Sequence, residues 1–418
     1  MGKTKPKSFV ISKESVWLAY QRVKANRGAC GIDQVSLKEF EENLQDNLYK
    51  IWNRMSSGCY FPPPVRRVDI PKANGETRPL GIPTVGDRIA QMVVKMDLEP
   101  KLEPVFHAWS YGYRPGRSAL EAVGAARRNC WQRSWVLDLD IKGFFDSIDH
   151  KLLIKAVRKH TECRWHVLYI ERWLKAPAMH ADGSSEERLR GTPQGGVISP
   201  LLANLFLHYA FDVWMQRYWA GIWFERYADD MVCHCDTEQQ AEALRESLRE
   251  RLQACGLTLH PTKTQIVYCK DDRRREAYAN TRFNFLGFEF RGRTAVDRRG
   301  FRFTGFNPAI SPVKVQGIRD RIRGMVGTQQ SGWSLGHLAQ RLNPCLRGWW
   351  NYYGKFYRSE LEQQVGRFLD MRIMHWARRK YKSLRDSWRR AWLWLMRLRR
   401  KRQGLFAHWS SGWVGRAV

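Results

Sequence analysis

Short stretches in which hydrophobic and polar residues alternate predict β-strands in the first 300 residues. Residues 65–70 and 78–83 flank an Asn-Gly pair and predict a hairpin that turns at residues 74–75. The same alternation predicts a strand at 135–141, a hairpin at 224–235 with its turn at 228–230, and a strand pair at 283–290.

Helical spacing of apolar residues fills the segments between these strands. It predicts helical structure in the first sixty residues, with clear helical spacing of apolar residues over 39–55. It also predicts a helix that Asp87 caps and a buried helix over residues 199–220 that is apolar on nearly all sides. From residue 311 onward the spacing is helical. The pattern therefore predicts an α+β region followed by an all-α region.

The composition favours a nucleic-acid partner. Of the 418 residues, 71 are Lys or Arg and 41 are Asp or Glu, which gives a formal net charge of +30. Such a charge attracts a polyanion, and nucleic acid is favoured over an anionic membrane because no basic segment has a clean apolar face. No apolar stretch reaches the roughly twenty residues of a membrane helix. The nine cysteines include no Cys-x-x-Cys pair, which argues against a zinc ribbon or disulfide scaffold and for a reducing compartment.

Positive charge is concentrated toward the C-terminus. Residues 301–418 contain 24 Lys and Arg against 5 Asp and Glu, and 9 of the 19 Trp residues. Within residues 385–402, basic residues interleave with Trp, and the apolar positions 388, 392 and 395 or 396 fit one helix face. Arg and Trp together suit phosphates and unstacked bases, with a solvated helix and ordinary Trp packing as the alternative.

Acidic residues in strand contexts are the strongest chemical signal. Asp138 and Asp140 lie at the end of one apolar strand, and Asp229 and Asp230 form the tip of a hairpin. A carboxylate in a buried strand is costly unless it is paired or binds a metal. If the two strands are neighbours, these carboxylates can hold two divalent ions for phosphoryl transfer, and oxygen ligands favour Mg²⁺. The alternative is that Asp229 and Asp230 only form a turn, where Asp is common.

A set of motifs surrounds these carboxylates in a fixed order. They are residues 70–72 and 78–83, 140–150, 192–200 (Thr-Pro-Gln-Gly-Gly-Val-Ile-Ser-Pro), 227–230 (Tyr-Ala-Asp-Asp), 256–264 and 285–288. Together they resemble the reverse transcriptase family, in the form found in group II intron-encoded proteins. Residues 343–353 resemble the maturase domain of the same proteins, which also serves as the polymerase thumb.

The resemblance implies an α+β right-hand polymerase whose fingers and palm hold an antiparallel sheet. Fingers and palm would occupy residues 1–295, an all-α thumb/maturase (X) domain residues 300–380, and a basic DNA-binding tail residues 385–418. Many relatives carry a further endonuclease with cysteine pairs, and the lack of such pairs here implies the form without that domain.

The resemblance also assigns the catalytic centre. Asp140 and Asp229 would be metal ligands together with the Ile141 carbonyl, and Asp230 would be the third catalytic carboxylate. One of two Mg²⁺ ions would activate the primer 3′-OH, and the other would steady the leaving pyrophosphate.

Other polar residues nearby have structural interpretations. Asp138 shares a strand face with the catalytic Asp140 but lies deeper, and Asp146 and Asp149 are expected to cap the following helix. The Cys-His-Cys sequence at 233–235 is expected to serve packing, because no second pair of metal ligands is visible.

The expected nucleotide-binding residues come from four motifs. Lys72 and Arg78 flank the first hairpin and suit a triphosphate, unless the hairpin is only an exposed charged loop. By resemblance, Phe145 is the gate that clashes with a ribose 2′-OH and so favours dNTPs, with a core phenylalanine as the alternative. The remaining candidates are the N–H groups of Gly143 and Phe144, the bare backbone at Gln194 and Gly195, and Lys263 at the leaving pyrophosphate.

The resemblance implies RNA-directed DNA synthesis from an RNA template, a DNA primer or target, dNTPs and Mg²⁺. It also implies binding to a group II intron RNA for splicing and retrohoming, in the bacterial cytoplasm and associated with the nucleoid. Two alternatives stay open: a domesticated reverse transcriptase in defence or repair, and an RNA-binding splicing factor without polymerase activity. An RNA-dependent RNA polymerase is disfavoured by Phe145. The expected nucleic-acid contacts are Arg347, Trp349, Arg389, Arg390, Arg397, Arg399, Arg400, Lys401 and Arg402.

Overall fold

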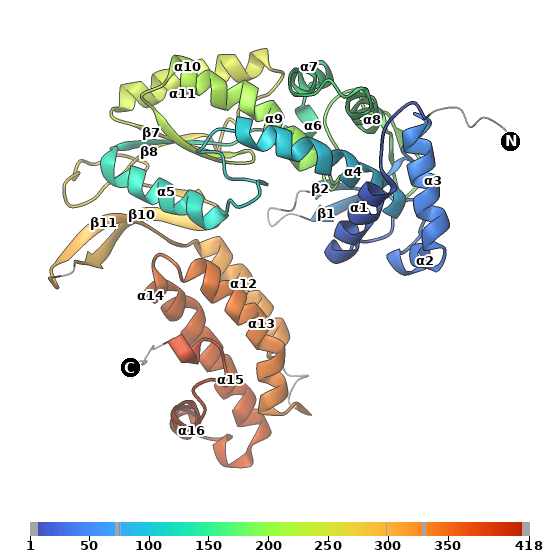
Figure 1. Cartoon of the computed structure of the whole chain (residues 1–418). Coiled ribbons are helices and arrows are strands. Elements are labelled where there is room, and N and C mark those ends of the chain that lie inside the picture. The colour runs from blue at the N-terminus through green and yellow to red at the C-terminus, as the bar shows by residue number, and fades with distance from the viewer. Residues whose placement is uncertain (1–6, 72–74, 76, 298, 328–331, 412–418) are drawn as a thin grey trace. The chain divides into compact units, whose positions relative to one another are not determined.

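The computed structural model describes the chain except residues 1–6, 72–74, 76, 298, 328–331 and 412–418 (Figure 1). The chain forms two compact units, each built from separate segments. The first unit contains Met1–Ser118, Leu139–Cys233 and Gln239–Thr264, and the second contains Ala119–Asp138, His234–Glu238 and Gln265–Val418. The chain passes between the units inside strands β3 (Trp135–Leu139) and β7 (Asp230–Cys235).

Helices make up most of the first unit, and α1 packs along α4 (Figure 1). The predicted buried helix over residues 199–220 is confirmed as α9, the π-helical turn η2 and α10 in succession. The helices of this unit are α1 (Lys13–Asn26), α2 (Leu37–Glu42), α3 (Leu44–Ser56), α4 (Val85–Leu102), η1 (Glu103–Val105), α6 (Phe144–Ser147), α7 (His150–His160), α8 (Arg164–Lys175), α9 (Ser199–Leu207), η2 (His208–Asp212), α10 (Val213–Tyr218) and α11 (Glu238–Ala254).

A four-stranded sheet in the first unit contains the first predicted hairpin. Its strand order is β2 (Thr77–Ile82), β1 (Val65–Pro71), β4 (Ala178–Met179) and β5 (Ser185–Glu186). Strands β1 and β2 pair antiparallel with Arg66 opposite Ile82, which confirms the predicted hairpin, and β4 joins β1 in parallel. The predicted turn residue Asn74 lies outside the described residues.

The predicted helical structure over residues 39–55 is confirmed, in the form of two helices divided at Asn43. Backbone angles of φ −121° and ψ 43° at Asn43 end α2, and α3 starts directly afterwards. The Asn47 side chain donates to the Phe40 carbonyl (3.0 Å), which satisfies an acceptor that the break leaves open. Apolar periodicity runs across such a break and so does not reveal it.

Asp87 does not cap a helix, contrary to the prediction. The cap of α4 is Thr84, whose hydroxyl accepts from the Asp87 N–H (3.1 Å). The Asp87 carboxylate is buried and accepts hydrogen bonds from the Tyr60 hydroxyl (2.8 Å) and the Trp173 indole (2.7 Å). Burial raises its pKa to about 6.

The second unit begins with helix α5 (Ala119–Gln132) and β-structure. Strand β3 pairs antiparallel with β8 (Gln265–Tyr268), which confirms the strand predicted at 135–141. The predicted strand pair at 283–290 is also confirmed. It belongs to a three-stranded antiparallel sheet in the order β11 (Arg302–Ile310), β10 (Phe288–Val296) and β9 (Arg282–Phe285).

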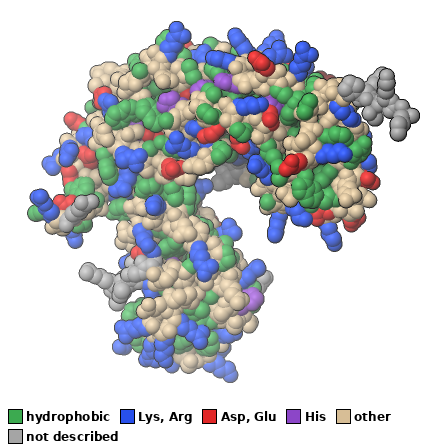
Figure 2. All heavy atoms as spheres, in the orientation of Figure 1, with side chains coloured by type: hydrophobic (Ala, Val, Ile, Leu, Met, Phe, Trp, Pro, Cys, Tyr) green, Lys and Arg blue, Asp and Glu red, His purple; other side chains and the backbone are tan. Residues whose placement is uncertain are grey.

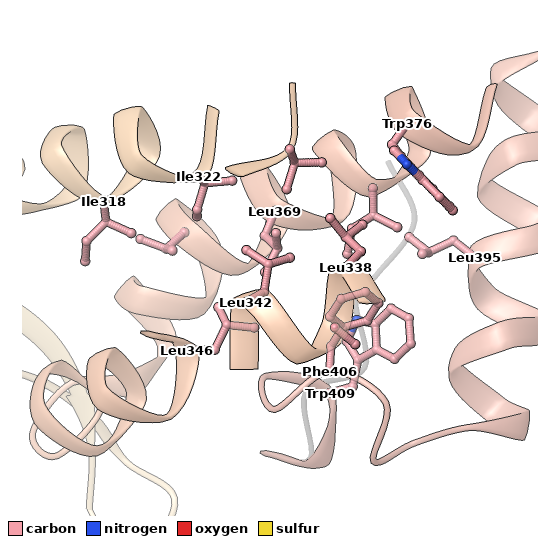
Figure 3. Packing of buried hydrophobic residues seen from close by; sticks show 14 of the residues in the cluster. Ile318, Ile322, Leu338, Leu342, Leu346, Leu369, Trp376, Leu395, Phe406 and Trp409 are labelled. Carbon is pink, nitrogen blue, oxygen red and sulfur yellow. The ribbon is translucent and has the colours of Figure 1, made fainter. Parts of the chain in front are cut away.

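Helices form the rest of the second unit around one apolar core (Figure 3). Leucine, isoleucine and aromatic side chains from α12, α13, α15, α16 and residues 406–409 point into this core, and each contributes about 1.5–3 kcal/mol by burial. The predicted α+β fold with an all-α region is therefore confirmed. The elements are α12 (Pro312–Met325), α13 (Leu335–Tyr353), α14 (Arg358–Leu361), η4 (Glu362–Gly366), α15 (Arg367–Lys380), η5 (Lys382–Leu384), α16 (Trp388–Lys401) and η6 (Trp409–Ser411).

The buried face of α16 differs from the predicted one. Ala391 and Leu395 are fully buried, whereas Trp388 and Trp392 are 44% and 37% exposed. The small Ala391 side chain allows close helix packing, and the Trp388 ring instead stacks on the Arg378 guanidinium at 4.0 Å. The face of α16 that packs against the core is therefore centred on Ala391 and Leu395 and not on Trp388 and Trp392.

Candidate active site

A strained turn presents one candidate carboxylate. Strands β6 (Trp223–Tyr227) and β7 confirm the hairpin predicted at 224–235, and Ala228 and Asp229 connect them. Ala228 has a φ of 57°, in the left-handed region that costs a non-glycine residue about 1–2 kcal/mol. Such a conformation persists only where the surrounding contacts hold it. The turn that carries Asp229 is therefore held by its environment.

Asp140 follows β3 and is anchored by its backbone. The His260 N–H donates to the Asp140 carbonyl (2.7 Å), and Ile141 forms an isolated antiparallel bridge with Leu259. This bridge uses the carbonyl of Asp140 and leaves the carbonyl of Ile141 outside the pair. The Ile141 carbonyl therefore takes no part in the hydrogen bonds of this bridge.

The carboxylates of Asp140, Asp229 and Asp230 act on one another electrostatically. Burial raises the pKa of Asp229, and the negative charge of Asp140 adds to this. Surrounding protein, and then the charges of Asp229 and Asp140, raise the pKa of Asp230 to about 7. The Asp230 side chain is exposed, so water screens part of this repulsion. The Lys263 ammonium lies 2.9 Å from Asp140 Oδ2 and supplies the opposite charge.

Carboxylate and carbonyl oxygens suit hard divalent cations, and the mutual repulsion of these carboxylates is what a cation would relieve. Asp140, Asp229 and the Ile141 carbonyl provide such a donor set. In the described part of the chain, however, no three His, Cys, Asp or Glu side chains stand together closely enough to hold a metal ion. Because Lys263 contacts Asp140 Oδ2, a cation that uses this oxygen must displace the ammonium.

The segment after Asp140 contains the proposed nucleotide gate. Gly143 has a φ of 56° and precedes α6, where Phe144 and Phe145 pack edge to face with ring centroids 5.5 Å apart. Phe145 is 7% exposed, and its carbonyl accepts from the Thr192 N–H (2.7 Å). This placement is compatible with both interpretations of Phe145, as a side chain of the core and as the gate against a ribose 2′-OH.

The two predicted caps after Phe145 have different outcomes. Asp149 caps α7, since its carboxylate accepts from the Leu152 N–H (2.8 Å), which confirms the prediction. Asp146 lies inside α6 and is not a cap, so that prediction is wrong. The Asp146 side chain is exposed, yet partial desolvation by the surrounding protein raises its pKa, although the nearby Arg188 opposes the shift.

The Gln194 segment is bound to strand β2. The Gly81 N–H donates to the Gln194 carbonyl (2.7 Å), and the Arg78 guanidinium hydrogen-bonds the Gln194 side chain. Gly195 has a φ of 119°, and a Cβ there would lie 2.6 Å from the Gly81 carbonyl. The bare backbone at Gly195 is therefore required by β2 itself, whereas the sequence suggested the approach of nucleic acid. Lys72 lies outside the described residues.

The structure places Arg78 and Lys263 within electrostatic range of Asp229, because both cations oppose the rise of its pKa. The expected catalytic residues and part of the expected nucleotide site therefore belong to the same unit. Four other residues have the structural placements expected of them. Asp138 accepts a hydrogen bond from the Gln265 side chain (3.1 Å), and the Cys-His-Cys side chains at 233–235 are buried.

The expected nucleic-acid contacts lie on the helices of the second unit. Lys and Arg side chains gather around the end that holds α16 (Figure 2). Trp349 is partly buried, with the Arg321 guanidinium over its ring at 5.9 Å. Arg399 departs from the expectation, because its side chain is largely buried and lies 3.8 Å from Asp370. The exposed members of the predicted set are Arg347, Arg389, Arg390, Arg397, Arg400, Lys401 and Arg402.

Sequence reasoning missed residues that surround the turn. Tyr113 has a φ of 56°, and its ring centroid lies 6.3 Å from that of Tyr227. Burial, and then the charge of Asp229, raises the pKa of Tyr113. Behind the turn, Arg226 forms a fully buried ion pair with Asp212. Opposite charges at otherwise apolar helix and strand positions were the available signal for this pair.

Comparisons with known proteins match two successive parts of the chain. Residues 70–290 match the family described as reverse transcriptase (RNA-dependent DNA polymerase). Residues 315–394 match the group II intron, maturase-specific domain. In the described residues, no helix combines the length and apolar character needed to span a bilayer.

Individual relatives each match about half of the chain. Protein YkfC of Escherichia coli is 36% identical over 281 residues, which cover 58% of this chain and 73% of that protein. Group II intron-encoded protein LtrA of Lactococcus lactis is 37% identical over 203 residues, 48% of this chain but only 33% of LtrA. The putative COX1/OXI3 intron 1 protein of Saccharomyces cerevisiae is 28% identical over 211 residues, covering 50% of this chain and 25% of that protein.

Proposed function

Because the chain belongs to the reverse transcriptase family and carries a group II intron maturase-specific domain, we propose that it copies RNA into DNA at the Asp140–Asp229–Asp230 centre. Reverse transcriptases use divalent metal ions, and we propose two Mg²⁺ ions here. The observation that carries this assignment is the convergence of three mutually repelling carboxylates on one strand end and one strained turn.

In this mechanism the carboxylates have distinct tasks. Asp140, Asp229 and the Ile141 carbonyl would hold the ions, which when bound would supply Lewis-acid activation of the primer 3′-OH and stabilisation of the leaving pyrophosphate. Asp230, whose pKa is raised to about 7, is partly protonated at neutral pH, and bound cations would favour its ionised form. Lys263, whose ammonium contacts Asp140 in the structure, would neutralise negative charge on the leaving pyrophosphate.

We propose that the incoming dNTP is bound by the β1–β2 hairpin and the segments bonded to it. Arg78 and Lys72 meet the triphosphate, Gln194 and Gly195 line the path of the base pair, and the N–H groups of Gly143 and Phe144 face phosphate oxygens. Phe145 excludes the ribose 2′-OH. A Phe145→Ala enzyme should therefore gain rNTP incorporation in a primer-extension assay, and unchanged selectivity would contradict the gate.

The second unit is proposed to bind group II intron RNA, and so to assist splicing and retrohoming at bacterial DNA. The maturase-specific match over 315–394 and the exposed basic residues of α16 support this role. The functional regions proposed are fingers and palm over 1–295, thumb/maturase over 300–380, and a nucleic-acid-binding region over 385–418.

The deciding experiment is primer extension on an RNA template with dNTPs and Mg²⁺, for the wild type beside Asp229→Ala, with RNA binding measured for both. Extension by the wild type alone, with equal RNA binding, is the expected result. If neither protein extends and both bind RNA tightly, the chain is a splicing factor without polymerase activity.

A further inference from the structure

A fully buried ion pair lies behind the catalytic turn. Arg226 on β6 and Asp212 at the end of η2 are both 0% exposed. Their contact is two-pronged, with Arg226 Nε 2.7 Å from Asp212 Oδ1 and Nη2 2.6 Å from Oδ2. Burial opposes ionisation of Asp212, but Arg226 outweighs it and keeps the pKa below the usual value. The fork geometry therefore holds the guanidinium plane in one orientation.

The third guanidinium nitrogen of Arg226, Nη1, connects the turn to helix α9. Its Nη1 donates to the Ala228 carbonyl (3.3 Å) and to the Asn204 side-chain oxygen (2.9 Å). The Asn204 side-chain NH₂ in turn donates to the Gly112 carbonyl (2.5 Å). One chain of hydrogen bonds thus links α9, the catalytic turn and the segment that contains Gly112.

That segment lies directly against the hairpin. The Arg226 backbone accepts from the Tyr111 N–H (2.8 Å) and donates to the Trp109 carbonyl (3.0 Å). A Cβ at Gly112 would lie 2.3 Å from the backbone nitrogen of Ala228, so the two backbones touch. The residue after Gly112 is Tyr113, which like Ala228 is in the left-handed region. The strained residues Ala228 and Tyr113 therefore lie at a backbone contact so close that neither segment can shift toward the other.

We propose that Arg226, with Asp212 and Asn204, forms a positioning device that keeps the turn carrying Asp229 aligned with the Tyr113 segment. The inference rests on the proposed polymerase function and adds residues that contact neither primer nor nucleotide. Filling the interior does not require charges at these positions, since an apolar pair of similar volume can replace a buried ion pair without loss of stability. The directed hydrogen bonds to Ala228 and through Asn204 are what an apolar pair cannot supply.

The test separates positioning from folding. In the full-length protein, the double variant Arg226→Met/Asp212→Leu fills the same space without the directed bonds. We expect thermal stability and primer–template affinity close to wild type, a kcat at least tenfold lower, and a higher Mg²⁺ concentration for half-maximal extension. A stable double variant with wild-type kcat and Mg²⁺ dependence would overturn the proposal.

A second variant decides the question if the double variant does not fold. Asn204→Ala keeps the ion pair but removes both hydrogen bonds of the Asn204 side chain, the one from Arg226 and the one to Gly112. We expect kcat and Mg²⁺ dependence to shift in the same direction as in the double variant. The control is Arg172→Met, which removes two bonds to the carbonyls of Gly58 (2.8 Å) and Tyr60 (2.5 Å) in the same unit. If Asn204→Ala extends primers as well as this control, the positioning role is wrong. A wild type that extends nothing would instead refute the polymerase function.

Discussion

The two units of the molecule place their charged residues differently. Around the catalytic turn, Arg226, Asp212 and the partly buried Asp229 are held inside the protein. In the helical part of the second unit, leucines and aromatics fill the core, while most of the basic residues of α16 lie at the surface. Catalysis requires charges at fixed positions, whereas phosphate binding requires charges that can reach a flexible polyanion. We therefore expect that mutations can separate the two proposed activities, DNA synthesis and intron RNA binding.

The largest effect should come from the catalytic carboxylates. Asp140→Asn removes one metal-binding charge and the partner of Lys263, so we expect extension to fall at least ~10³-fold. RNA affinity should stay unchanged because the second unit is untouched. Single-turnover extension and filter binding on the same preparation measure both quantities. A parallel loss of RNA binding would mean that the units do not act separately.

Neutralising α16 should produce the opposite pattern. A triple variant Arg397→Gln/Arg400→Gln/Lys401→Gln should weaken intron RNA binding about tenfold or more at 0.1 M salt and reduce the salt dependence of binding. Extension of a saturating short primer–template should be retained. A matched control removes three exposed charges from α7 in the first unit, at Lys155, Arg158 and Lys159. Equal losses in both variants would indicate that only net charge matters.

A smaller effect concerns stability and pH. The pKa of Asp230 is raised from 3.8 to about 7, so the folded state holds a proton that the unfolded state has released. The contribution of this carboxyl to the free energy of unfolding is fully present below about pH 4 and is lost as the pH rises through about 7. In metal-free buffer, Asp230→Asn should therefore match the wild type near pH 4. At pH 8 it should be more stable by about 1 kcal/mol after solvent screening, while extension is lost. Thermal melts across this range measure the difference, and a variant less stable at pH 8 would contradict the repulsion.

The smallest effect should come from the cation beside Asp140. Lys263 opposes the rise in the pKa of both Asp229 and Asp230, so Lys263→Gln should raise both values. The acid limb of the pH–rate profile for extension should then move to higher pH. Lys155→Gln on the exposed face of α7 is the control and should leave the profile in place. A shift toward lower pH would contradict the electrostatic assignment of Lys263.

Local patterns predicted much of the fold and the centre of the site. Alternation found the β1–β2 and β6–β7 hairpins, and apolar spacing found the buried helix that starts at Ser199. The carboxylates at 140, 229 and 230 stood out because they interrupt apolar strands. These features are encoded within a few residues of sequence, so they can be read without knowledge of tertiary contacts.

The errors involved residues whose roles depend on distant partners. Asp87 resembles a helix cap in sequence, but its carboxylate is held by Tyr60 and Trp173. The need for glycine at 195 likewise comes from a distant partner, because a Cβ there would lie 2.6 Å from the carbonyl oxygen of Gly81. The roles of such residues are set by contacts with residues distant in sequence, and the periodicity of apolar residues along the chain does not encode those contacts.

The most direct test of the separation between the units measures two activities on two variants. Asp229→Ala and the α16 triple variant are each assayed for primer extension and for splicing of a cognate group II intron RNA. We expect Asp229→Ala to support intron splicing without extending primers, and the α16 triple variant to extend primers without splicing the intron efficiently. Loss of both activities in Asp229→Ala, with the protein folded, would contradict this expectation.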